Sequence, residues 1–165
     1  MKPKSPKIFL LTNTPENVLA THALSHDSIE RIVQNIPKAT DPTLPLYSVW
    51  VSREEDLHDF VYQVPDLAWE MLEYAEEPLE IIYPRRKFVS PQNETTEDPI
   101  SIRLVRGRQL ESFVRRHGPL LTFRAVNKQT ESIIDETHDL REKDAPYDKV
   151  KSMKLFADGS FTFVR

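Results

Sequence analysis

The alternation of short apolar segments with amphipathic segments constrains the fold of this chain more than any other feature of its sequence. The apolar segments have the length of strands and lie at residues 8–11, 46–51, 79–83, 100–105, 119–123 and 133–134. Between them, apolar residues recur with the period of a helix at residues 27–36, 52–61, 65–75 and 108–117. Strands that alternate with helices predict an α/β fold, with helices packed on a mixed sheet.

Local signals mark the start of the first helix and the end of the fold. Asp27 and Glu30 have the spacing of a capping box, which predicts that Asp27 caps the first helix. Near the C-terminus, Asp158-Gly159 separates two apolar segments, 150–156 and 160–164. This dipeptide is a strong turn signal, so the sequence predicts a closing C-terminal β-hairpin.

Length and composition limit the class of protein. The 165 residues contain no repeat and no linker-like segment, which predicts a single domain over residues 1–165. There is no run of about 18 apolar residues, so we expect no membrane partner. The absence of cysteine excludes disulfides, thiol nucleophiles and cysteine zinc sites, and it is compatible with a cytoplasmic location.

Several common catalytic motifs are missing. The three glycines, at positions 107, 118 and 159, are too far apart to form a glycine-rich phosphate loop. His22 and His26 have a spacing that suits a metal on a helix, but we expect both in a loop and find no third ligand. No serine has an evident histidine partner. The sequence therefore predicts no metal site and no intact catalytic constellation.

Charge is distributed unevenly along the chain, whose net charge is −4. Residues 53–80 contain ten acidic residues against Arg53 alone, whereas residues 85–128 contain ten basic residues and four acidic ones. A basic region within an acidic chain is typical of a site for an anionic partner. The alternative is a solvated surface balanced by the acidic segment.

Arg103 is the most informative basic residue because it interrupts the apolar segment 100–105. An arginine on a strand that faces a cleft is a candidate for bidentate anion binding. The alternative is an ion pair with the acidic segment 53–80.

Five segments resemble the YrdC/YciO-like family in order and spacing, and the resemblance extends over nearly the whole chain. They are VPDLAW at 64–69, PLEIIYP at 78–84, ISIRLV at 100–105, GPL at 118–120 and MKLFADGSF at 153–161. The resemblance implies a twisted mixed sheet around a basic concave pocket. Active members of the family are threonylcarbamoyl-AMP synthases, which use ATP, threonine and bicarbonate in tRNA threonylcarbamoyladenosine modification. The family has also been described as binding double-stranded RNA.

The ligand-binding motifs of that family are mostly replaced here. Residues 11–15, LTNTP, stand where the family has a Y-P-T-[DE]-T motif, and Lys38 is all that remains of a K-x-R motif. Glu80 replaces the threonine of P-L-T, and residues 124–126, RAV, replace S-A-N, for which Asn127 substitutes only with a shift of one residue. A late serine motif is not kept at 150–151, whereas the family arginine matches Arg103. Each lost partner of a buried ligand group costs about 1–3 kcal/mol, so the sequence predicts a diverged member.

We therefore expect a non-catalytic protein that binds double-stranded RNA or tRNA at the rebuilt pocket rim. The alternative is a residual threonylcarbamoyl-AMP synthase with ATP as its cosubstrate, and a third hypothesis is a protein-interaction subunit that uses the acidic segment. The residues expected to bind the anion are basic and are Lys38, Arg85, Arg86, Lys87, Arg103, Arg106, Arg108, Arg115, Arg116 and Arg124.

Overall fold

The structure is a computed structural model that describes most of the chain. The described residues are 7–14, 17–36, 47–75, 78–84, 99–124, 126–141 and 150–164. None of the helices that they form has both the length and the apolar character needed to cross a membrane.

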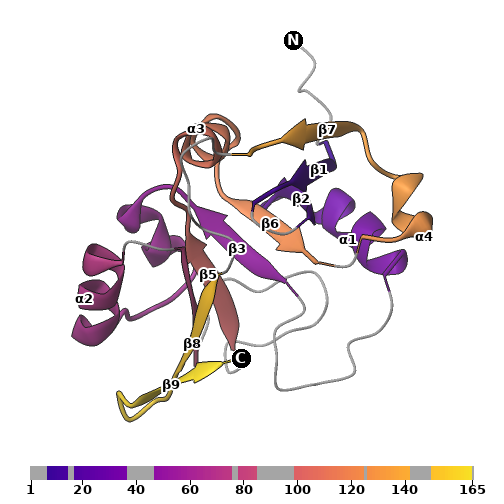
Figure 1. Cartoon of the computed structure of the whole chain (residues 1–165). Coiled ribbons are helices and arrows are strands. Elements are labelled where there is room, and N and C mark those ends of the chain that lie inside the picture. The colour runs from indigo at the N-terminus through magenta and orange to yellow at the C-terminus, as the bar shows by residue number, and fades with distance from the viewer. Residues whose placement is uncertain are drawn as a thin grey trace.

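The nine strands that the described residues form belong to one mixed sheet (Figure 1). They are β1 (Phe9–Thr12), β2 (Val18–His22), β3 (Ser48–Val51), β4 (Leu79–Tyr83), β5 (Ile100–Leu104), β6 (Leu120–Phe123), β7 (Glu136–Asp139), β8 (Lys151–Leu155) and β9 (Phe161–Val164). Their order across the sheet is β7-β1-β2-β6-β3-β5-β4-β8-β9. The prediction of a mixed sheet with packed helices and a closing hairpin is confirmed, since β8 and β9 pair antiparallel at one edge.

One face of the sheet carries the larger hydrophobic core. It is covered by α1 (His26–Gln34), by the 3-10 helix η1 (Glu54–Asp59) and by α2 (Asp66–Tyr74). Ile29 and Ile32 of α1 and Leu72 of α2 are buried there. Every residue of β4 and β5 is buried, so both faces of these central strands are covered.

The opposite face has two different halves. Helix α3 (Arg108–His117) packs Leu110, Phe113 and Val114 against apolar residues of β1, β2, β3 and β6, including Trp50. Beyond Trp50 the face becomes polar, because strand positions two residues apart share a face and β4 and β5 place Glu80 and Arg103 there.

Two predictions about individual elements are wrong, and the strand β2 was missed. Residues 133–134 form no strand; a short helix, α4 (Lys128–Glu131), precedes them and the strand β7 follows. The sequence also gave no sign of β2, whose first four residues are all buried and therefore show no polar alternation. Residues 52–61 were expected to be an α-helix, but only the six residues of η1 are helical, and they form a 3-10 helix.

The first helix begins earlier than the capping pattern predicted. Its N-cap is Ser25. Asp27 lies within the first turn, where the helix dipole stabilises a negative charge. His22 ends β2 and His26 opens α1, so neither histidine lies in a plain loop as expected.

Candidate functional site: a buried arginine and carboxylate cluster

The polar half of the second sheet face is built by cross-strand register. Arg103 of β5 lies directly between Trp50 of β3 and Glu80 of β4. Ser48, two residues before Trp50, faces the same side, as does its β6 partner Thr122. The sheet thus places one arginine and one carboxylate side by side on strands that contain no other charged residue.

Glu80 is the centre of this cluster. Its Oε1 accepts a hydrogen bond from Ser48 Oγ at 2.7 Å and another from Arg103 Nη2 at 3.3 Å. Its Oε2 accepts from Arg124 Nη2 at 3.1 Å. Glu80 is only 6% exposed, so these partners replace the water that the carboxylate loses on folding.

Arg103 is held by groups from three other parts of the chain. Besides Glu80, its Nη1 donates to the backbone oxygen of Thr14 at 3.0 Å. Its guanidinium carbon lies 4.2 Å from the centroid of the Trp50 ring, which is the geometry of a cation–π contact. With 1% of its surface exposed, Arg103 is a core residue in this conformation.

The electrostatics of the cluster favour a charged Glu80. Burial by itself raises the pKa of a carboxyl group, but Arg103, Arg124 and the hydroxyl of Ser48 outweigh burial. The pKa of Glu80 is therefore lowered below its ordinary value of 4.5. At neutral pH the carboxylate neutralises part of the charge that the two guanidiniums would otherwise offer to an anionic ligand.

The two arginines of the cluster differ in access. The Arg124 side chain is 58% exposed, whereas that of Arg103 is 1% exposed, although both bind the same carboxylate. An anion arriving from solvent meets Arg124 first and has to displace Glu80 to reach Arg103. Arg103 forms an ion pair with a residue of segment 53–80, as the alternative interpretation expected. The partner, Glu80, lies on the strand β4 and not on a helix.

A second group of expected anion-binding residues lies on α3. Arg108, Arg115 and Arg116 are exposed, and their spacing places them along one side of the helix. Helix α3 packs on the same sheet face as Trp50, so these arginines and the cluster lie on the same side of the sheet.

Of the remaining expected residues, only Arg106 is described by the structure, and it belongs to neither group. Arg106 donates to the backbone oxygen of Leu72 at 3.0 Å, a contact that ties β5 to α2. Lys38, Arg85, Arg86 and Lys87 lie outside the described residues. The assignment of these basic residues to an anion site stays a prediction.

Asn127 has a structural role in the described residues. Asn127 caps α4, where its side-chain oxygen accepts from Thr130 N at 3.0 Å while Thr130 Oγ1 accepts from Asn127 N at 2.9 Å. Among the residues that the structure describes, no three histidine, aspartate or glutamate side chains are grouped as a metal ion requires.

Sequence reasoning missed the parts of the cluster that come from β3 and from Thr14. Ser48 and Trp50 carry no motif, and the contact of Thr14 uses its backbone oxygen. One signal was present: a glutamate and an arginine each interrupt an apolar strand, and two such strands are natural neighbours in a sheet.

Comparisons with known proteins show the fold. No family model matches the chain, and no curated protein matches it. Among solved structures, a double variant of Sua5 from P. abyssi is 15% identical, with a TM-score of 0.74 over 96% of this chain and 49% of that chain. Sua5 from P. abyssi complexed with L-threonine is 14% identical, with a TM-score of 0.70 over 96% of this chain and 50% of that chain. The MTH1692 protein from Methanobacterium thermoautotrophicum is 16% identical, with a TM-score of 0.52 over 91% of this chain and 74% of that chain.

The chain has a YrdC-like fold. It spans about half the length of the Sua5 chains that it matches. At 14–16% identity these likenesses establish the YrdC-like sheet and its helices, and the side chains on that sheet have to be interpreted from their own contacts.

Proposed function

We propose that this YrdC-like protein is a non-catalytic module that binds RNA through the exposed arginine face of α3. The observation that carries the proposal is that α3 has a basic exposed side and an apolar buried side. Arg108, Arg115 and Arg116 are exposed on one side, while its apolar residues are buried against the sheet.

The exposed side of α3 suits a phosphate backbone. Arg108 and Arg115 are seven residues apart, about 10 Å along a helix axis, which is long enough to reach more than one phosphate of a strand. The acidic residue of α3, Glu111, is half-buried. Burial and the neighbouring Arg116 lower the pKa of His117 below 6.5, so at pH 7 the arginines supply the charge of this surface.

The buried cluster supports the non-catalytic part of the proposal. The two arginines that face the polar half of the sheet, Arg103 and Arg124, already bind a carboxylate of the same chain. A nucleotide phosphate placed there would be repelled by Glu80 and would have to break the Glu80–Arg103 contact.

Binding to a short RNA duplex, measured by fluorescence anisotropy at several salt concentrations, tests the proposal. We expect binding that weakens steeply with salt, and a triple variant, Arg108→Ala with Arg115→Ala and Arg116→Ala, that binds more weakly. Each lost phosphate contact lowers the slope of log K against log salt by about 0.7–0.9.

The control removes two exposed cations, one fewer than the triple variant, from the opposite face of the sheet. Arg31 of α1 and Lys128 of α4 are both exposed, so Arg31→Ala with Lys128→Ala changes the net charge without touching α3. RNA binding that is absent at low salt, or that falls equally in the control, contradicts the proposal.

A second candidate function is residual threonylcarbamoyl-AMP synthesis in tRNA modification. It is favoured by the fold likeness to Sua5 complexed with L-threonine and to HypF in a phosphate- and nucleotide-bound form, which is 13% identical with a TM-score of 0.62 over 96% of this chain and 26% of that chain. Release of pyrophosphate from ATP in the presence of threonine and bicarbonate tests it directly. Release at the background rate rejects it.

A further inference from the structure

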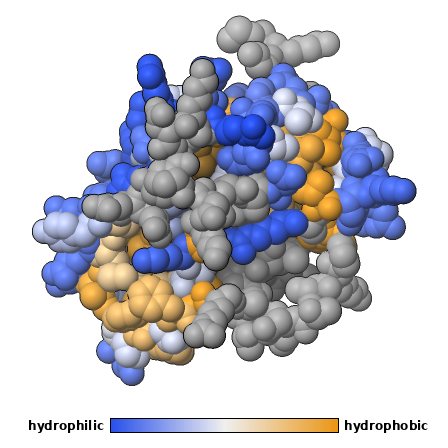
Figure 2. Space-filling view, viewed as in Figure 1, coloured by the Kyte–Doolittle hydropathy of each residue, from blue (hydrophilic) through white to orange (hydrophobic). Residues whose placement is uncertain are grey.

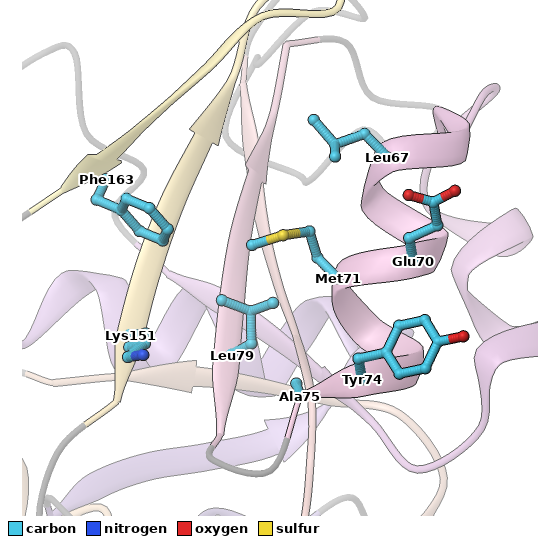
Figure 3. A pocket seen from close by; sticks show the side chains of 8 residues that line it. All are labelled: Leu67, Glu70, Met71, Tyr74, Ala75, Leu79, Lys151 and Phe163. Atoms are coloured by element: carbon cyan, nitrogen blue, oxygen red, sulfur yellow. The ribbon is translucent and has the colours of Figure 1, made fainter.

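A groove with a volume of about 510 Å³ lies between α2 and the β8–β9 hairpin. Figure 3 shows Leu67, Met71 and Tyr74 of α2 on one side and Phe163 of β9 on the other, with Leu79 of β4 between them. Figure 2, in the same view as Figure 1, shows an apolar surface at the lower left, over the place where α2, β8 and β9 lie. The groove belongs to neither the buried cluster nor the arginine face of α3.

The groove exists because the helical layer stops before the sheet does. Phe163 pairs in register with Met153 on the face that α2 covers. Met153 is fully buried, whereas Phe163 is 56% exposed and Tyr74 is 77% exposed. No helix among the described residues covers β9, so an apolar strip of the sheet face stays open beside α2.

The rim of the groove is acidic along α2. Asp66, Glu70 and Glu73 are exposed, the helix contains no basic residue, and Glu70 lines the groove itself. Lys151 of β8 is the one basic residue among the described residues that line the groove, and it lies on the side away from α2. An occupant therefore needs apolar side chains for the floor and positive charge for the α2 rim.

We infer that this groove docks a basic amphipathic helix from a partner protein. Such a helix completes the layer over β8 and β9, with anchors at i, i+3 or i+4, and i+7 in the groove and lysine or arginine over the α2 rim. A second copy of this chain does not offer such a helix from its described residues. Its basic helix, α3, has Leu110, Phe113 and Val114 buried in its own core.

Binding of a synthetic probe to the full chain tests the inference. The probe is a fluorescein-labelled helical peptide with leucine at every third or fourth position and lysine or arginine elsewhere, measured by anisotropy. We expect saturable binding that weakens about tenfold or more in Phe163→Glu and in Tyr74→Glu. Both positions are exposed, so the variants keep the fold, which circular dichroism verifies.

A second set of variants tests the contribution of the acidic α2 rim to peptide binding. Glu70→Lys with Glu73→Lys is expected to weaken the basic peptide several-fold, with a larger effect at low salt. The matched controls are Phe156→Glu, which lies on the same hairpin outside the groove, and Glu54→Lys with Glu55→Lys on η1; both leave the affinity unchanged.

Three results would overturn the inference. The first is the absence of saturable binding, and the second is equal binding of a peptide that has glutamate in place of its cations. The third is a concentration-dependent dimer, seen by sedimentation, that Phe163→Glu dissociates, because the occupant would then be a second copy of the chain.

Discussion

Replacing Glu80 by glutamine keeps the size of the side chain and removes its charge. In the native protein this carboxylate receives hydrogen bonds from Ser48, Arg103 and Arg124. Glutamine can still accept from one of these donors, but the guanidinium of Arg103 is left without its carboxylate in a site that is 1% exposed. The perturbation therefore tests how much a buried charge depends on its counter-charge.

The expected loss of stability follows from how deeply each arginine is buried. Removing one partner of a buried ion pair costs about 3–5 kcal/mol. Because Arg103 keeps the Thr14 backbone oxygen and the Trp50 ring, we expect Glu80→Gln to cost about 3 kcal/mol, the lower end of that range. Arg124 is 58% exposed, so Arg124→Ala is expected to cost less than about 1 kcal/mol.

Urea unfolding followed by circular dichroism measures these differences in the free energy of unfolding. Glu30→Gln, an exposed glutamate on α1, is the matched control and should stay within about 0.5 kcal/mol of the native protein. The double variant Glu80→Leu with Arg103→Met removes both buried charges, and it should be more stable than Glu80→Gln. Equal costs for Glu80→Gln and Arg124→Ala would refute the reasoning, since burial would then not decide the energy.

Three further predictions concern pH, glycine conformation and helix capping. Because the pKa of Glu80 is lowered below 4.5 in the folded protein, its contribution to stability is present above about pH 4.5 and is lost as the pH falls through the lowered pKa; acid titration should therefore destabilise the native protein more steeply than Glu80→Gln. Gly118 has φ +78° and an added Cβ would lie 3.2 Å from His22 Nε2, whereas Gly159 has φ +90° with nothing within 4 Å; thermal unfolding should show Gly118→Ala to be the more destabilising of the two, and the reverse order would contradict the contact. Asn127→Ala removes the cap of α4 and should cost about 1 kcal/mol in urea unfolding, while an unchanged midpoint would show that the short helix does not need it.

Much of the central sheet could be predicted because its strands are apolar and its turns carry strong local signals. Both β4 and α3 were predicted with their observed bounds, 79–83 and 108–117. β7 was missed because its sequence, ETHD, contains no apolar residue, and its pairing with β1 comes from tertiary contacts. The 3-10 geometry of η1 was missed because a short apolar period fits both kinds of helix.

The sequence by itself determined the alternation of strands and helices, the buried faces of the central strands and the basic side of α3. These features follow from local periodicity, which each segment carries in its own residues. Only the tertiary structure decided what Arg103 does. Its partners come from positions 14, 50 and 80, far from it in the chain. Strand register brings Trp50 and Glu80 beside it, and the segment that follows β1 brings the backbone oxygen of Thr14 within contact distance. Whether a guanidinium in this sheet meets a ligand or a carboxylate of its own chain depends on that register, because burial leaves no water to take the place of the partner.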